Sequence, residues 1–365
     1  IIMFILYYLP ILFGVIALSI TLINNRKLDL YFLLIIFIFV FLVTGTKFNS
    51  DVDYFEYYEL YLETPSLDII SLENIKSLYG EIGYLYFTSF LKLFESDFVV
   101  VTLVFSSLSM LFKIVVSFNI VNKSSFLIIL YLYLYFITVE FIEMRWSLAS
   151  GMIILSYYLL IIDKKKYAYF FLFLAATIHY FAILFLILSI FLAINFVKKN
   201  DNLYLFISVV IACMFFSIFI GKNTMVIELD EINIYIVQRI LRYFNDPQSG
   251  LGIFSYLKIC LYILIFLLFV NKYNYRQVYY VKISCIFLSI SLFLSVVPIF
   301  YYRSMVVSDF FALATIIHII DNNLNKKLRV FSILIIFFLF STWFIFDVNN
   351  YIISERILDY KSLLY

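Results

Sequence analysis

Residues 29–46, DLYFLLIIFIFVFLVTGT, decide the fold class of this chain. Only the first residue of the segment is charged, and an α-helix needs about 20 mostly apolar residues to cross the hydrocarbon core of a bilayer. The whole chain shares this character, because 65% of its 365 residues are hydrophobic and only 14% are charged. A soluble domain has about a quarter charged residues. We therefore predict an all-α protein that crosses a membrane many times.

Apolar segments of this kind recur along the chain. The stretch 167–197 is too long for one upright helix at about 1.5 Å per residue, so we expect two short helices that meet near His179. Together with the other segments this predicts about twelve spans in one integral membrane domain, residues 1–365, and we consider a GT-C-like arrangement of those spans. The remaining predicted spans are 1–23, 98–120, 125–142, 145–162, 203–221, 253–271, 280–298, 305–320 and 329–346.

Basic residues are distributed unevenly between the two sets of loops that alternate along this pattern. By the positive-inside rule the set richer in Lys and Arg is cytoplasmic. Both chain ends then face outward, together with two larger extracytoplasmic loops, 47–97 and 222–252. The second loop contains a predicted amphipathic helix. The basic set consists of Arg26, Lys27, Lys113, Lys123, Lys164, Lys165, Lys166, Lys198, Lys199, Lys272, Arg276, Lys282, Lys326, Lys327 and Arg329.

The sequence contains no motif typical of a metal site, a disulfide framework or a nucleotide-binding site. Cys213, Cys260 and Cys285 lie in apolar runs without Cys-x-x-Cys spacing, which argues against a disulfide framework or a zinc site. There is no P-loop and no dinucleotide fingerprint. We therefore expect no cofactor, no metal and no nucleic-acid partner, and we look for the chemistry in the outer loops.

The exit of the second span carries the first candidate site. Asp51 and Asp53 are two carboxylates at a helix end. The segment that follows predicts a short helix with a tyrosine face and an acidic face. Tyrosines suit stacking on sugar rings, but the same stripe is typical of an interfacial aromatic belt. The two faces consist of Tyr54, Tyr57, Tyr58 and Tyr61, and of Glu56, Glu59 and Glu63.

Arg145 is the strongest single candidate. It lies between two predicted spans, and a charge near membrane depth is costly unless it is paired or hydrated. Its planar guanidinium suits phosphate oxygens, although Glu140 or Glu143 could simply neutralise it. His179 interrupts an apolar run and is either a site residue or a satisfied core histidine. Glu81 precedes a short apolar helix. We expect this helix either to lie on the membrane surface or to be re-entrant.

Three further arginines are candidates for anion binding. Arg239 and Arg242 share one face of the amphipathic helix predicted at 232–244, where they would bind a lipid pyrophosphate or touch lipid headgroups. Arg303 lies at the outer edge of a later span. Asp309, six residues further on, is its alternative partner.

These pieces together resemble the EpsG-like, Wzy-type polysaccharide polymerases. The similarity lies in a Gly-Thr pair followed by Asp-x-Asp-Tyr, then Glu-x-Gly-Tyr, Met-Arg-x-Ser-x-Ala and Ala-x-x-x-His, in this order. Ile82 stands where the family usually has proline, and Trp146 where glutamine is common. The matching residues are Asp51, Asp53, Tyr54, Glu81, Gly83, Tyr84, Arg145, Ser147, Ala149, Ala175 and His179, with Arg303 as a later family arginine.

The resemblance implies a function at the outer face of the bacterial inner membrane. Such proteins join undecaprenyl-pyrophosphate-linked oligosaccharide repeats into O-antigen, capsule or exopolysaccharide. The partners would be a lipid-linked donor, a lipid-linked acceptor and membrane lipid, and a chain-length regulator protein is a further candidate.

The resemblance also suggests roles for single residues. Arg145 and Arg303 would bind pyrophosphate, helped by Arg239 or Arg242. His179, or a carboxylate of Asp51 or Asp53, would be the base. Glu81 would position sugar or act as an alternate base. Tyr54 and Tyr84 would contact sugar.

Two other activities stay open at this point. A flippase for the same lipid-linked unit would have a similar number of spans, but we find no similarity between the two halves of the chain of the kind common in transporters. A glycan ligase would use the same outer-face chemistry and is harder to separate from a polymerase by sequence.

Overall fold

The computed structural model describes residues 5–69, 80–193, 202–220, 253–269 and 275–358, and within these ranges the chain is helical without strands. The predicted all-α class is therefore confirmed for the described residues. The chain divides into two compact units, residues 1–193 with 320–365, and residues 194–319. Arg239, Arg242 and the predicted second outer loop lie outside the described residues.

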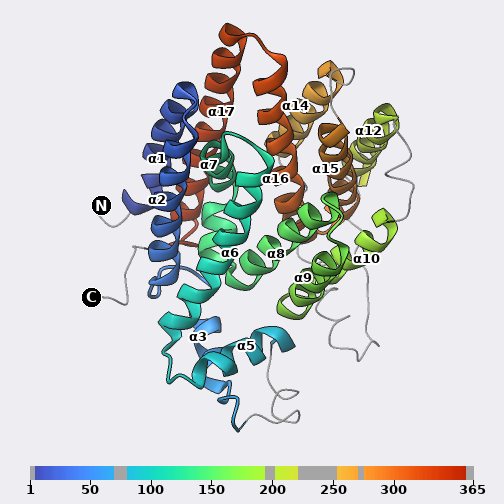
Figure 1. Cartoon of the computed structure of the whole chain (residues 1–365). Helices are drawn as coiled ribbons and strands as arrows, with labels where there is room; N and C mark the ends of the chain where they lie inside the picture. The colour runs from blue at the N-terminus through green and yellow to red at the C-terminus, as the bar shows by residue number, and fades with distance from the viewer. Residues whose placement is uncertain (1–4, 70–79, 194–201, 221–252, 270–274, 359–365) are drawn as a thin grey trace. The chain divides into compact units, whose positions relative to one another are not determined.

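The first unit holds the candidate site (Figure 1). Its helices are α1 (Ile5–Ile23), α2 (Arg26–Gly45), α3 (Tyr54–Glu63), α5 (Ile82–Lys92), α6 (Phe98–Ile120), α7 (Ser124–Tyr135), the π-helical segment η2 (Phe136–Ile142), α8 (Met144–Ile161), α9 (Lys165–Ile178), α10 (Ala182–Ala193) and α17 (Lys326–Ile353).

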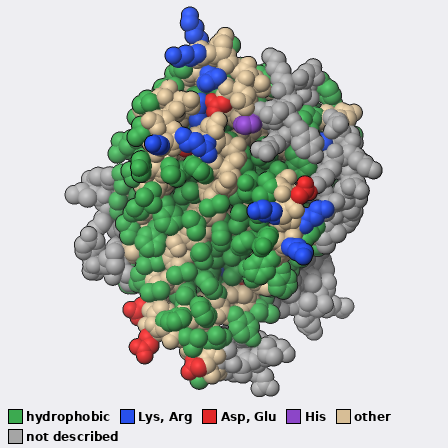
Figure 2. Space-filling model, in the orientation of Figure 1, with side chains coloured by type: hydrophobic (Ala, Val, Ile, Leu, Met, Phe, Trp, Pro, Cys, Tyr) green, Lys and Arg blue, Asp and Glu red, His purple; other side chains and the backbone are tan. Residues whose placement is uncertain are grey.

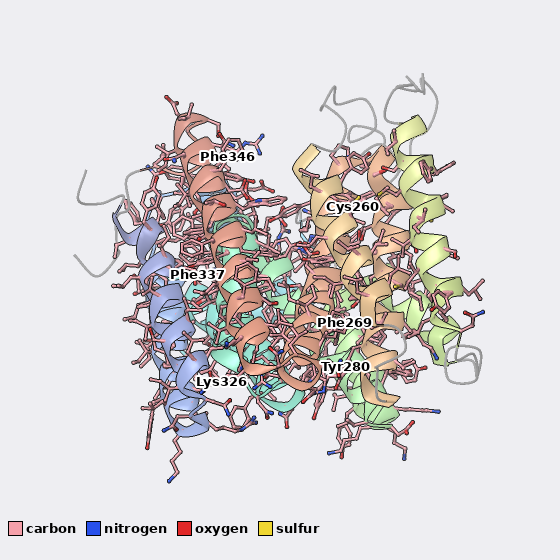
Figure 3. The ribbon with its side chains drawn as sticks, turned by 90° about the horizontal axis from the view of Figure 1, so that it is seen from above. Cys260, Phe269, Tyr280, Lys326, Phe337 and Phe346 are labelled. Atoms are coloured by element: carbon pink, nitrogen blue, oxygen red, sulfur yellow. The ribbon has the colours of Figure 1, made fainter. Side chains whose placement is uncertain are left out.

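The second unit is built from α12 (Leu203–Ile220), α14 (Ile253–Phe269), α15 (Tyr275–Phe293), the short 3₁₀ turn η4 (Leu294–Val296) and most of α16 (Pro298–Asn323). Figure 3 marks α14 by Cys260 and Phe269 and α15 by Tyr280. The predicted spans 280–298 and 305–320 are wrong in their boundaries, because α16 already begins at Pro298. Proline suits the first position of a helix, where its missing N–H would have no partner in any case.

Local sequence explains several helix ends. The side chain of Asn25 accepts hydrogen bonds from the N–H groups of Lys27 and Leu28, and so caps α2. Asn325 caps α17 in the same way through the N–H of Leu328. Asparagine is among the preferred residues at this position, since it satisfies backbone donors that the helix leaves unpaired.

Residues near both ends of the described chain lie together with the segment that follows α2, at one end of the first unit. The Tyr7 hydroxyl donates to the carbonyl of Leu358 at 2.8 Å, and Asp51 forms an antiparallel bridge with Ile357. At the opposite end the guanidinium of Arg26 donates to Asn122 Oδ1 at 2.8 Å. This agrees with the predicted pattern in which both termini share one side with loop 47–97. Which membrane face each end occupies stays a prediction.

Apolar surface covers much of this unit. Figure 2 shows a broad hydrophobic face, with many basic side chains toward its upper edge and acidic ones at its lower edge, near α3 and α5. Leu34 on α2 and Phe338 on α17 are examples of large exposed apolar residues. Such a surface suits lipid rather than water. Lys326, Phe337 and Phe346 mark the course of α17 in Figure 3.

Seven helices in the described residues are long and apolar enough to cross a membrane, and three shorter apolar helices accompany them. The chain is thus a multi-pass membrane protein, while the predicted count of twelve spans stays a prediction. The predicted break at His179 is confirmed, because α9 ends at Ile178, α10 begins at Ala182, and His179 between them has an extended backbone.

The assignment of Lys113 to a cytoplasmic loop is wrong. Lys113 lies within α6 and is fully buried, with its Nζ 2.7 Å from Glu140 Oε1. A charge inside a membrane protein is tolerated when it pairs with an opposite charge in the protein interior. Lys113 therefore carries no information about sidedness.

Candidate functional site

Arg145 forms a buried ion pair at the end of the first unit that carries α3 and α5. It lies in the first turn of α8, and its Nη1 donates to Glu81 Oε2. Glu81 immediately precedes α5 and is also buried. Arg145 Nη2 is 3.9 Å from Glu56 Oε1, a carboxylate on α3 whose side chain is 56% exposed. Among the described residues, the carboxylate that neutralises Arg145 is thus that of Glu81. Glu140 instead forms an ion pair with Lys113.

Two tyrosine rings flank the guanidinium. The Arg145 carbon Cζ lies 5.0 Å from the ring centre of Tyr57 and 5.6 Å from that of Tyr84. Both distances suit a cation–π interaction. Burial raises the pKa of Tyr84 to about 12 and raises the pKa of Tyr57 further. Both phenols therefore stay neutral near pH 7 and do not offset the positive charge of Arg145.

The two aspartates at the exit of α2 have different environments. Asp51 is buried, and its Oδ2 is 2.7 Å from Nζ of Lys47, four residues earlier in the segment that follows α2. Its Oδ1 also accepts the backbone N–H of Asp53 at 3.1 Å. For Asp53, burial and then the neighbouring charges of Asp51 and Glu143 raise the pKa to about 6. Asp51 thus shapes the turn, while Asp53 is a carboxylate of raised basicity.

His179 contacts the residue that follows Arg145 in the chain. Its Nδ1 accepts the backbone N–H of Phe181 at 3.2 Å. Its ring packs edge-on against Trp146, the residue after Arg145, with 5.3 Å between ring centres. The break between α9 and α10 therefore lies next to the first turn of α8. A cavity shared by Arg145 and His179 stays a prediction.

The chain's family follows from a comparison over most of its length. A profile described as the EpsG family matches residues 30–362. The chain belongs to the EpsG family. This family is associated with Wzy-type polymerases. No curated protein and no solved structure matches the chain.

The tyrosine stripe of this EpsG-family chain is used largely for packing. The rings of Tyr54, Tyr58 and Tyr61 lie 5.5–5.6 Å from the ring of Phe98, at the start of α6. Tyr57 alone turns toward Arg145. The sugar-contact role of Tyr54 stays a prediction, and its buried ring already fixes α3 against α6.

The remaining predicted arginine of the EpsG-family chain lies in the other unit. Arg303 is half-buried on α16. Asp309, its alternative partner, forms an ion pair with Lys258 on α14. The proposed cooperation of Arg303 with Arg145 stays a prediction.

Sequence reasoning missed Lys47 and Tyr57 as parts of the site. Lys47 and Asp51 both lie beyond the end of α2, so the spacing rule for helical pairs did not apply to them and gave no signal of their ion pair. Tyr57 carried no separate signal, since its spacing matched that of the packing tyrosines.

The surroundings of Gly83 explain why the Glu-x-Gly-Tyr motif has a glycine at this position, and they allow a prediction. A Cβ at this position would lie 2.7 Å from the backbone carbon of Thr177 on α9. Gly83→Ala should push α5 away from α9 and cost about 1–3 kcal/mol of stability, as overpacking does. Thermal melting of the purified protein measures this loss.

Gly80→Ala is the matched control. A Cβ at Gly80 would first meet the Leu85 side chain, at 3.1 Å, and that side chain can shift. Equal melting temperatures for the two variants would contradict the close approach of α5 to α9.

Proposed function

We propose that this EpsG-family chain polymerises undecaprenyl-pyrophosphate-linked oligosaccharide repeats at the outer face of the bacterial inner membrane. The observation that carries the proposal is the buried Arg145, held by Glu81 between two tyrosine rings, at the end of the first unit that carries α3 and α5. A fixed guanidinium at this depth suits the pyrophosphate of a lipid-linked donor, whose lipid tail stays in the bilayer.

The reaction transfers a growing glycan between two lipid-linked units. An acceptor hydroxyl attacks the anomeric carbon of the donor glycan, and the bond from that carbon to the pyrophosphate oxygen breaks. The hydroxyl proton passes to a base, and the lipid pyrophosphate leaves with the bonding electrons. Arg145 stabilises the charge that develops on this leaving group.

The pairing of Arg145 leaves room for a ligand. A guanidinium carries five N–H donors in a fixed fork. Glu81 engages Nη1, and Glu56 Oε1 lies 3.9 Å from Nη2. Because Glu56 is more than half exposed, a pyrophosphate can displace it at little cost. Arg303, Arg239 and Arg242 remain proposed as further contacts to the pyrophosphate.

Asp53 is the base that we propose. A base works best with a pKa near the working pH, and Asp53 has a pKa of about 6. Asp51 is less suitable because it is paired with Lys47. His179 accepts a backbone N–H at Nδ1, so its neutral ring carries the proton on Nε2. We assign His179 as a donor to a sugar or phosphate oxygen, while Tyr84 and Glu81 border the sugar.

Deletion of the gene in its native strain tests this function. Loss of a polymerase should leave surface glycan with a single repeat unit on its acceptor, as seen by gel electrophoresis of the extracted glycan. Loss of a ligase would leave no glycan on the acceptor, and loss of a flippase would block export of the repeat unit. Either of the last two outcomes would refute the polymerase proposal.

A further inference from the structure

A second charged cluster lies deeper in the first unit, and the reaction above does not use it. Lys113 on α6 and Glu140 on η2 pair at 2.7 Å, and both side chains are fully buried. The Tyr131 hydroxyl also donates to Glu140 Oε1 at 2.7 Å, and Lys113 Nζ donates to Ser109 Oγ at 2.6 Å. The polar atoms of the pair are thus surrounded by protein partners.

Such a pair is a poor way to gain stability. Apolar residues of similar volume are often as stable as a buried ion pair, because two charges lose their hydration on burial. Ionisable residues inside membrane proteins are usually functional. Glu140 moreover lies on a π-helical segment, a feature frequent at functional sites.

The cluster is bonded to the helix turn that carries Arg145. Ser147, two residues after Arg145, donates from its Oγ to Glu140 Oε2 at 2.7 Å. Its carbonyl accepts from Lys113 Nζ at 3.0 Å. The first turn of α8 is therefore held at both a side chain and a backbone oxygen.

The same π-helical segment also reaches the carboxylate side of the site. Lys47, the partner of Asp51, donates from Nζ to the carbonyl of Phe141, the residue after Glu140. A small pocket lined by Lys47, Glu140 and Ser147, among others, lies between the two ion pairs. One segment thus connects the turn of Arg145 with the turn of Asp51 and Asp53.

We propose that the Lys113–Glu140 pair is a positioning device that, through Ser147, holds the first turn of α8 and so sets the place of Arg145. Lys113, Glu140 and Ser147 are positioning residues, since they act on the substrate through Arg145. The identity of the anion at Arg145 rests on the function proposed above, whereas the control of this helix turn does not.

Trp146 reports on this turn directly. It is one of two tryptophans in the chain, so Trp343→Phe leaves it as the only one. The full-length protein with this substitution, in lipid nanodiscs, serves as parent. The emission wavelength and acrylamide quenching of Trp146 report the position and solvent exposure of the first turn of α8. The affinity for farnesyl pyrophosphate reports the anion-binding site at Arg145.

Ser147→Ala should increase quenching of Trp146 and weaken binding of the probe about tenfold, because small displacements of a binding group are costly. Ser156→Ala is the matched control. Ser156 is buried on the same helix, and within the described residues its hydroxyl donates to the carbonyl of Met152, inside α8, so this variant should behave like the parent.

The double variant Lys113→Met with Glu140→Leu separates positioning from stability. It should change Trp146 quenching and weaken binding while the melting temperature is kept or raised. Parent-like quenching and binding in both this variant and Ser147→Ala would overturn the positioning role. A parent that fails to bind the probe, with quenching still changed in the variants, would instead refute the pyrophosphate site and leave the positioning role standing.

Discussion

Arg145→Ala should abolish long glycan chains while the protein still inserts in the membrane. The guanidinium is placed to meet charge that develops on the leaving pyrophosphate, and loss of one such group typically costs about 10²–10³ in rate. Arg145→Lys should restore little, because an ammonium replaces the planar fork with a point charge. Glycan length in a complemented deletion strain measures the effect, with immunoblots of membranes for protein amount.

The control for this prediction addresses the other role that Arg145 fills. Its removal leaves the buried Glu81 without its partner, and an unpaired buried charge is strongly destabilising. Arg145→Ala combined with Glu81→Gln removes both charges and should recover protein amount but no long chains. Restored chains in the double variant would show that Arg145 only neutralises Glu81.

Asp53→Asn should lower the polymerisation rate by about 10²-fold or more, the usual contribution of a general base. The raised pKa of about 6 means that Asp53 becomes ionised, and so active, as pH rises from 5 to 7. The wild-type initial rate should rise over this interval with a midpoint near pH 6, and the rise should be absent in Asp53→Asn. Initial rates in nanodiscs with the strain's own lipid-linked repeat measure both.

The free energy of unfolding should fall as pH rises, whereas the polymerisation rate increases. Because the pKa of Asp53 is higher in the fold than in the unfolded chain, the fold binds this proton more tightly, and stability declines as pH rises through about 4 to 6. Asp53→Asn removes the cost of ionising this carboxyl in the fold, so the melting temperature of the variant at pH 7 should not be lower than that of the wild type. Loss of activity together with loss of folding would argue against the role as base.

Histidine titrates in the same pH range, so His179→Gln is the control for the assignment. A donor role predicts that His179→Gln lowers the rate less than Asp53→Asn and keeps the rise near pH 6. Asp51→Asn should instead disturb the ion pair with Lys47 and lower stability. If the pH dependence disappears in His179→Gln and persists in Asp53→Asn, the histidine is the base.

Local sequence determined the helices of this protein and the order of its motifs. The segment 29–46 predicted a span, and α2 is that helix from Arg26 to Gly45. The break at His179 was also predictable, because the apolar run is too long for one span. Both follow from properties of consecutive residues, namely hydrophobic length and backbone geometry, which need no knowledge of the neighbours.

Only the tertiary structure decided which charges meet. Sequence offered Glu140 or Glu143 as alternative partners of Arg145, but Arg145 pairs with Glu81, 64 residues away, and Glu140 pairs with Lys113. In an interior of low dielectric an ion pair depends on contact and geometry. Contact between residues far apart in the chain is set by the faces on which α5, α6 and α8 pack, and a sequence of apolar spans does not distinguish these faces.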